Sequence, residues 1–174
     1  GYKIDFDFKL YFSEVWREKG GFDVVIGNPP YVQLQDKERI SSNLLKYYGL
    51  QNFRTFVRSG DIYSLFYEQG LKLSSPVNGI LSYITSNRFC FTNYGESTRK
   101  FLSEYNLKQI INLNKVEVFK EANVGTIITI VENNKYRKGK LRAGEFNSYN
   151  TNVSFIDQLF EQSKIIDSKY YNSS

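Results

Sequence analysis

The sequence predicts an α/β fold in which short buried strands alternate with helices. Three runs of β-branched and other apolar residues have the length of a strand, and helical periodicity fills the two stretches between them. The order strand, helix, strand, helix, strand is typical of a parallel sheet with right-handed crossover helices. The expected strands are residues 22–27, 79–84 and 109–113, and the expected helices begin at Asp61 and Tyr94.

The first part of the chain contains two strand-like patterns. Residues 2–8 alternate between apolar and charged side chains, which predicts a half-buried strand, and a helical turn is expected at residues 12–16. The run from 22 to 27 has no polar alternation beyond Asp23, as in a strand that is buried on both faces of a parallel sheet. It ends abruptly at an Asn-Pro-Pro-Tyr sequence that begins at Asn28.

The first helix follows a long polar stretch. Leu65 and Phe66 fall near one face of this helix, and the Ser-Ser-Pro sequence at residues 74–76 ends it. Either Ser59 or Asp61 can cap its first turn, because both side chains carry an oxygen that accepts a backbone hydrogen bond.

The second helix is expected over residues 94–105. A strand at residues 126–131 follows strand 109–113 with only a loop between them, so it can lie antiparallel to its predecessor. Beyond residue 135 the composition becomes polar, with one amphipathic helix near residues 155–160. We therefore expect two parts, residues 1–135 with the sheet, and residues 136–174 as a linker or the start of a following module.

Composition excludes several classes of protein. A length of 174 residues with 41% hydrophobic and 24% charged side chains fits one domain with a core. A net charge of +5 permits an anionic partner without requiring one. Cys90 is the single cysteine and histidine is absent, which excludes an internal disulfide, the common zinc sites and mechanisms that depend on histidine. We expect a cytoplasmic protein with no metal site and no membrane span and, since the sequence lacks methionine, part of a longer protein.

The Asn-Pro-Pro-Tyr sequence is the motif that carries chemistry. It follows the first buried strand, at the edge where open α/β sheets bind ligands. Proline restricts its own φ and the residue before it, so Asn28 and Pro29 are expected to be extended. The Asn28 side-chain oxygen and the Pro29 carbonyl can then accept both hydrogens of a planar amino group, and Tyr31 offers a ring face. A rigid turn that only ends the strand is the alternative.

Such a holder can activate an amine without a general base. An amine attached to an aromatic ring is a poor nucleophile because its lone pair is delocalised into the ring. Two acceptors that favour tetrahedral nitrogen localise the pair and direct it at an electrophile such as a sulfonium methyl. This is catalysis by orientation and fixed dipoles, which suits a chain without histidine.

Residues 22–31, Phe-Asp-Val-Val-Ile-Gly-Asn-Pro-Pro-Tyr, resemble the catalytic strand and loop of amino-group DNA methyltransferases. More narrowly, they resemble those of adenine methyltransferases fused into type IIG restriction-modification and related phage-defence enzymes. The resemblance covers roughly residues 6–132. It implies a partial Rossmann-like sheet of an S-adenosylmethionine-dependent methyltransferase whose last strand is antiparallel. It also implies methyl transfer to the exocyclic amine of a flipped adenine, with these catalytic residues: Asn28, Pro29, Pro30 and Tyr31.

Further matches imply contacts to the cofactor. In the family a segment like Asp-Ile-Tyr-Ser-Leu-Phe, here residues 61–66, opens the helix after the catalytic loop. By resemblance Phe66 packs on the adenine of S-adenosylmethionine and Asp61 shapes that pocket. A core aromatic and a helix cap are the structural alternatives for these two residues.

DNA is the partner that the resemblance implies. The target base must leave the duplex, and stacking between Tyr31 and Phe119 would return about 1–3 kcal/mol per stacked base. The segment around residues 85–89 resembles one that faces the catalytic cleft, and a basic stretch interleaved with aromatic residues follows Tyr31. The expected DNA-binding residues are Lys37, Arg39, Lys46, Arg54, Arg58, Asn87 and Arg88. Ordinary solvated surface is the alternative for each of them.

The cofactor-binding half that precedes the catalytic loop in the family has no counterpart here. A glycine-rich turn that opens a helix is expected there, whereas Gly20-Gly21 leads directly into a strand. The chain thus resembles the carboxyl-terminal half of the catalytic domain, with a target-recognition domain expected to follow. We expect such a fragment to be inactive alone, to bind the cofactor weakly, and to expose the apolar edge of strand 22–27 for self-association.

Two other functions remain open from the sequence. The same bracket could hold the amine of a glutamine side chain or of an RNA base, as in protein-glutamine and RNA methyltransferases. Alternatively, the chain is a DNA-binding module without chemistry. The long basic aromatic segment between Tyr31 and Asp61 argues against a small amide substrate.

Overall fold

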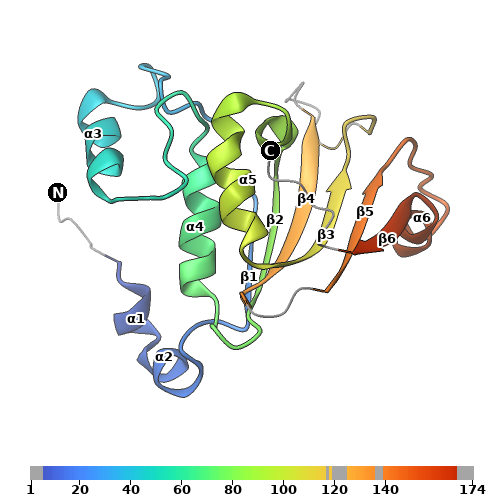
Figure 1. The fold of residues 1–174 in the computed structure, drawn as a ribbon, viewed down its shortest axis with the longest axis horizontal. Coiled ribbons are helices and arrows are strands. Elements are labelled where there is room, and N and C mark those ends of the chain that lie inside the picture. The colour runs from blue at the N-terminus through green and yellow to red at the C-terminus, as the bar shows by residue number, and fades with distance from the viewer. Residues whose placement is uncertain (1–5, 117, 119–124, 136–138, 168–174) are drawn as a thin grey trace.

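The computed structural model describes residues 6–116, 118, 125–135 and 139–167, and within these residues six strands form one sheet (Figure 1). The strands are β1 (Val24–Gly27), β2 (Ile80–Ser86), β3 (Asn106–Asn112), β4 (Thr126–Glu132), β5 (Lys140–Glu145) and β6 (Ser163–Asp167). The α-helices are α1 (Phe8–Tyr11), α2 (Ser13–Lys19), α3 (Ser42–Leu50), α4 (Tyr63–Leu73), α5 (Glu96–Ser103) and α6 (Phe155–Glu161). Two 3-10 helices, η1 (Asn87–Cys90) and η2 (Asn93–Gly95), follow β2.

The strands lie in the order β1-β2-β4-β3-β5-β6. Strand β1 pairs with β2 in parallel, and β3 pairs with β5 in parallel. Strand β4 is antiparallel to both β2 and β3, and β6 is antiparallel to β5. The α/β fold class is therefore confirmed, as is the antiparallel direction of the strand predicted at residues 126–131.

Helices α4 and α5 connect the parallel strands and cover one face of the sheet (Figure 1). Their inward side chains, among them Tyr67 of α4 and Leu102 of α5, pack with Leu81 of β2 and with Ile127 and Val131 of β4 in the main core. The Tyr67 hydroxyl also bonds to the Thr85 and Thr129 hydroxyls at 2.9 and 3.1 Å. The helical periodicity seen in the sequence thus becomes the packing that holds the sheet from one side.

The long segment between β1 and α4 builds a second core. Its residues Leu34 and Ile40 are buried against Ile62 and Leu65 at the start of α4, and side chains of α3 pack around them. This cluster fixes the segment on the side of α4 that faces away from β2. The start of α4 therefore lies between two cores.

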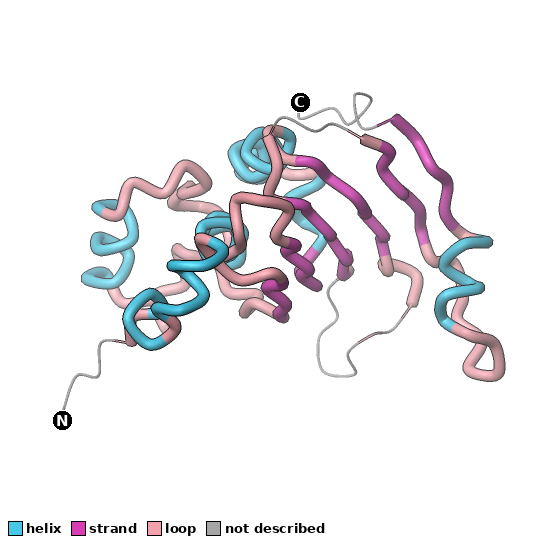
Figure 2. Tube along the Cα trace, turned by 90° about the horizontal axis from the view of Figure 1, so that it is seen from below, coloured by secondary structure: helices cyan, strands magenta, loops and turns pink. Residues whose placement is uncertain are grey.

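Helix α6 lies on the opposite face of the sheet from α4 and α5. Its Leu159 packs with Ile111 and Phe146, next to Ile84 and Ile128. Ile84 and Ile128 alternate along their strands with residues of the main core, so they point to the other face. Figures 1 and 2 show that α6 and α3 lie at opposite ends of the molecule.

The strand predicted at residues 2–8 is wrong for the part that the structure describes, because Phe8 begins helix α1 and residues 1–5 lie outside the described range. The Asp7 carboxylate caps this helix by accepting a hydrogen bond of 2.8 Å from the Lys9 N–H. Two aromatic rings that suggested a sheet face, Phe6 and Phe8, pack instead edge to face on each other, with centroids 4.9 Å apart.

The expectation that β1 is buried on both faces is also wrong. Strand β1 lies at an edge of the sheet, where Val25 packs on the main core while Val24 and Ile26 are 58% and 79% exposed. The β-branched run reflects a strand with apolar side chains on both faces, but in this chain one of those faces is uncovered. The exposed apolar edge expected for this strand is confirmed.

Strands β5 and β6 were not expected from the sequence, whereas the helix near residues 155–160 is confirmed as α6. No helix in the described ranges has the length and apolarity needed to cross a membrane. The same ranges contain no cluster of acidic or cysteine side chains suited to a metal ion.

Candidate active site

The candidate site lies at the carboxyl ends of the parallel strands. The register places Gly27 of β1 opposite Tyr83 of β2, so Asn28 leaves the sheet beside the last residues of β2. Asn87 follows β2 directly, and Leu113 follows β3. Because β1, β2 and β3 run in the same direction, the residues that follow them lie at the same end of the sheet. This is the end at which open α/β sheets bind ligands.

The Asn-Pro-Pro-Tyr loop combines an exposed amide with an anchored ring. Asn28 and Pro30 are exposed, Pro29 is buried and Tyr31 is half-buried. The hydroxyl oxygen of Tyr31 is buried, and this burial raises the pKa of Tyr31 to about 12. The phenol therefore stays neutral at physiological pH, and its hydroxyl end is enclosed while the residue as a whole is half-buried.

Backbone hydrogen bonds tie the exit of this loop to the start of α4. The Ile62 N–H donates to the Val32 carbonyl at 2.8 Å, and the Leu34 N–H donates to the Gly60 carbonyl at 2.8 Å. Between these bonds Gln33 and Asp61 form an antiparallel bridge. The predicted catalytic and cofactor-binding segments, which are distant in sequence, are thus neighbours in the structure.

Asp61 lies inside this junction and is 2% exposed. Its carboxylate accepts a hydrogen bond of 3.1 Å from the Tyr94 hydroxyl. Burial, and then the Asp61 charge, raise the pKa of both Tyr94 and Tyr63 above the usual tyrosine value. The helix-cap interpretation of Ser59 and Asp61 is wrong, since the N-cap residue of α4 is Ile62 and no side chain caps it.

Phe66 lines a small apolar pocket between α3 and α4. It is 38% exposed, and the pocket has a volume of ≈ 180 Å³. The lining residues are Tyr48, Phe53, Ile62, Leu65, Phe66 and Gln69. Walls of this kind suit a planar ring. The sequence offered Tyr48 and Phe53 only as members of an aromatic-rich stretch, and Gln69 carried no signal.

Asn87 is turned inward and Arg88 outward. Asn87 is 8% exposed, and its side-chain N–H donates to Asn112 Oδ1 at 3.1 Å. Its backbone N–H donates to the Gly125 carbonyl at 2.9 Å. Arg88, the next residue, is exposed. Phe119, expected to face Tyr31 across the target base, lies outside the described residues.

The predicted basic residues are exposed but have different surroundings. Arg54 pairs with Glu104, with Nη1 at 2.9 Å from Oε2, and lies over the Phe101 ring at 5.3 Å. Arg39 is 3.8 Å from the Asp36 carboxylate. No ion pair within the described part of the chain engages the three others, Lys37, Lys46 and Arg58.

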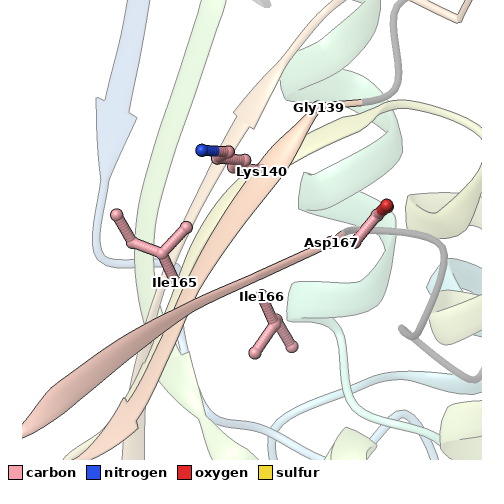
Figure 3. A pocket seen from close by; sticks show the side chains of 5 residues that line it. All are labelled: Gly139, Lys140, Ile165, Ile166 and Asp167. Carbon is pink, nitrogen blue, oxygen red and sulfur yellow. The ribbon is translucent and has the colours of Figure 1, made fainter.

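A larger pocket of ≈ 470 Å³ lies elsewhere, between the first residue of β5 and the last residue of β6 (Figure 3). It is lined by Gly139, Lys140, Ile165, Ile166 and Asp167. Strand β5 runs parallel to β3, so its first residue lies at the amino ends of these strands, opposite to the carboxyl ends where Asn28 lies. This pocket is therefore separate from the candidate site.

Type II methyltransferases are similar to this chain in sequence. The chain is 34% identical over 142 residues to the type II methyltransferase M.BstVI of Geobacillus stearothermophilus, which covers 80% of this chain and 24% of that protein. It is 36% identical over 117 residues to M.XhoI of Xanthomonas vasicola, which covers 66% of this chain and 20% of that protein. The chain thus spans about a quarter or less of these relatives.

Solved structures share the fold. A type I restriction-modification methyltransferase subunit from Streptococcus thermophilus superimposes with a TM-score of 0.61 at 17% identity, over 87% of this chain and 36% of that one. A Listeria monocytogenes protein described as a class I S-adenosylmethionine-dependent methyltransferase gives a TM-score of 0.54 at 21% identity, over 74% and 38% of the two chains. The expected partial methyltransferase fold is confirmed.

The family profile that matches describes an Eco57I restriction-modification methylase, and it covers residues 2–119. This range includes the loop from Asn28 to Tyr31, the Asp61 junction and the Phe66 pocket. The expected resemblance to restriction-modification methyltransferases is confirmed, and the chain belongs to the Eco57I restriction-modification methylase family.

Proposed function

We propose that this chain forms the amine-binding side of the active site of a DNA adenine methyltransferase, within a restriction-modification enzyme. The observation that carries the proposal is the exposed Asn28 at the end of β1, followed by the half-buried ring of Tyr31. Family membership supports methyl transfer to DNA. The exocyclic amine of adenine is the group that two such acceptors and an aromatic ring fit.

In this mechanism the protein orients the nucleophile. The Asn28 side-chain oxygen and the Pro29 carbonyl accept the two N–H groups of the amine, which localises the nitrogen lone pair, and Pro30 limits the movement of this bracket. S-adenosylmethionine, when bound, supplies an electrophilic methyl group on a sulfonium. The fixed dipoles of the bracket stabilise the positive charge that develops on the amine nitrogen, and the proton then leaves to solvent.

The pocket beside Phe66 fits the adenine ring of that cofactor. Phe66 and the neighbouring aromatic side chains provide a flat apolar wall, and the buried Asp61 shapes the pocket through Ile62, which lines it. A glycine-rich turn for the rest of the cofactor is absent from the sequence. We therefore propose that the chain alone binds the cofactor weakly and is inactive, and that other segments complete the enzyme.

DNA would lie along the edge that holds Asn28. The flipped adenine stacks on Tyr31, with Phe119 as the second aromatic of the sandwich. Exposed cations then contact phosphates, and Asn87 supports this edge from within. The exposed cations proposed to face DNA are Lys37, Arg39, Lys46, Arg54, Arg58 and Arg88, with the buried Asn87 supporting them from within. The cytoplasm is the location that fits this substrate.

A following target-recognition module is also part of the proposal, with residues 136–174 as a linker to it or as its start. Strand β5 pairs with β3, so such a module would continue from the catalytic sheet. The uncovered edge at β1 is the site that we propose for contact with the missing cofactor-binding half or with another copy of the chain.

Binding of an oligonucleotide with an extrahelical adenine tests the proposal. Asn28→Ala and Tyr31→Ala should each weaken binding about tenfold, as expected for loss of one hydrogen bond or of one stacked base. Asn152→Ala, an exposed asparagine on the loop before α6, is the matched control and should change nothing.

Two results would overturn this assignment. Equal losses from changes at any basic residue, with none from Asn28 or Tyr31, would indicate a DNA-binding module without chemistry. Tighter binding of a matched RNA or of a glutamine-containing peptide would indicate the other amino-group substrates.

A further inference from the structure

A buried carboxylate lies directly behind the Asn-Pro-Pro-Tyr loop. Asp61 is 2% exposed and bridges Gln33, two residues after Tyr31. Removing a carboxylate from water is costly unless hydrogen bonds or an opposite charge compensate. In the described part of the chain no salt bridge reaches Asp61, so its compensation comes from neutral donors.

Two phenols surround this carboxylate. The Tyr94 hydroxyl donates a hydrogen bond of 3.1 Å to Asp61 Oδ2. Tyr63 is fully buried two residues after Asp61, and this burial, the charge of Asp61 and hydrogen bonding to Asp61 all raise the pKa of Tyr63. Both phenols remain protonated, because burial and the Asp61 charge raise the pKa of each. Asp61 thus fixes Tyr94 through a hydrogen bond and also interacts with the Tyr63 hydroxyl.

Tyr63 connects this group to the catalytic loop. Its ring meets the Tyr31 ring edge to face, with centroids 6.3 Å apart and an angle of 86° between the planes. On the other side it contacts the Phe89 ring at 6.2 Å. Such pairs have a preferred geometry, so the position of Tyr63 restricts the angle of Tyr31.

We propose that Asp61 is a positioning residue for Tyr31, acting through Tyr63 and through the backbone bridge to Gln33. Its carboxylate holds the two phenols and the start of α4 in one arrangement, and this arrangement presents the Tyr31 ring at the angle that stacks on an extrahelical base. The stacking role of Tyr31 rests on the proposed function. The coupling between Asp61 and Tyr31 is a property of the chain alone.

The coupling is tested without DNA by NMR of the chain with ¹³C-labelled tyrosine rings. Asp61→Asn preserves the shape but replaces one acceptor oxygen by a donor, and Tyr94→Phe removes only the hydroxyl. Both variants should shift the Tyr31 ring signals, assigned with Tyr31→Phe. Asp23→Asn, at an exposed carboxylate just before β1, is the control. Unchanged Tyr31 signals in folded Asp61→Asn and Tyr94→Phe proteins would overturn the proposal.

The consequence for stacking is tested with an oligonucleotide that carries extrahelical 2-aminopurine, whose fluorescence falls when it stacks. At saturation Asp61→Asn should recover about half of the quenched signal and weaken binding about fivefold. A role in stability alone would lower the folded fraction but leave the quenching per bound molecule unchanged, and this result would refute positioning. Absence of quenching in the wild-type chain would instead refute the proposed function, while the NMR result still decides the coupling.

Discussion

Asn87 and Gly125 are joined by a backbone hydrogen bond of 2.9 Å that connects the end of β2 to the start of β4. A Cβ on Gly125 would lie 2.2 Å from Asn114 Oδ1 and 2.7 Å from Asn87 Nδ2, so glycine alone leaves room for this contact. The Asn87 side chain in turn bonds to Asn112 on β3. One buried asparagine therefore links three neighbouring strands at the edge that holds the candidate site.

Replacement of Asn87 and of Arg88 should have separate effects. Asn87→Ala removes a largely buried hydrogen bond and should lower the free energy of unfolding by about 1–2 kcal/mol. Arg88→Ala should leave stability within about 0.5 kcal/mol of wild type but weaken DNA binding. Urea unfolding and DNA titration of both variants measure this difference. A stability loss at Arg88 equal to that at Asn87 would contradict it.

Two helix glycines should respond to alanine with opposite signs. A Cβ on Gly70 of α4 would lie 2.5 Å from the Tyr83 hydroxyl and 2.6 Å from Leu81 Cδ1, so Gly70→Ala should cost about 1–3 kcal/mol. At Gly49 of α3 the nearest atom is 3.7 Å away, and Gly49→Ala should stabilise by about 0.5–1 kcal/mol. Thermal unfolding of the pair provides the measurement. Stabilisation by both changes would show that α4 does not pack this closely on β2.

The pair between Arg54 and Glu104 should make stability depend on acid pH. Hydrogen bonds from Arg54, helped by Lys135, lower the pKa of Glu104 from 4.5 to about 2. A lowered folded-state pKa stabilises the protein above the unfolded value of 4.5, and this contribution disappears as the pH falls toward 2. Because both side chains are partly exposed, it amounts to about 0.5–1 kcal/mol.

Arg54→Met tests this dependence. The variant should be less stable than wild type at pH 6, and the difference should vanish near pH 2. Arg58→Met, at an exposed arginine in the same segment, serves as control. Urea unfolding at several pH values gives the comparison, and a difference that persists unchanged at pH 2 would exclude the ion pair as its source.

The uncovered β1 strand should promote self-association. Ile26→Lys places a charge on a side chain that is 79% exposed, so it should reduce association without lowering stability. Sedimentation velocity across a concentration series measures this effect. Leu50→Lys makes the same kind of change at a 68% exposed side chain at the end of helix α3, away from any strand edge, and should leave association unchanged. A wild-type chain that remains monomeric at high concentration would contradict the prediction.

Most of the central sheet was predictable because its strands are apolar runs of ordinary length. The missed strands show the limit of that signal. Strand β5 contains the charged residues Lys140 and Arg142, of which Lys140 is exposed and Arg142 lies over the Phe160 ring at 4.2 Å. Its sequence therefore indicated a polar linker. Strand β6 pairs on one side only and has exposed isoleucines. Neither strand has the continuous apolar pattern from which the others were recognised.

The place of the loop from Asn28 to Tyr31 at the end of a strand could be predicted because one short segment determines it, while the catalytic role of the loop stays a prediction. Contacts between distant segments could not be predicted. The carboxylate of Asp61 was a plausible cap for α4, but the Tyr94 hydroxyl from η2 takes it as an acceptor. Arg54 had the features of a phosphate ligand, yet Glu104 lies within its reach only in the folded chain. The sequence shows which side chains can form hydrogen bonds or ion pairs, but the tertiary structure determines which of them meet.

Strand β4 lies between β2 and β3 although it follows both in the chain. During synthesis β2 and β3 are therefore made before β4, the strand that pairs with both of them. Until then each has unpaired backbone groups on the side that β4 will occupy. A ribosome-bound chain that stops before Thr126 leaves β2 open on one side and β3 open on both sides, because β5 also comes later in the chain. The sheet therefore closes only after residues 126–132 have been made, which keeps these strand edges open to wrong pairing until late in synthesis.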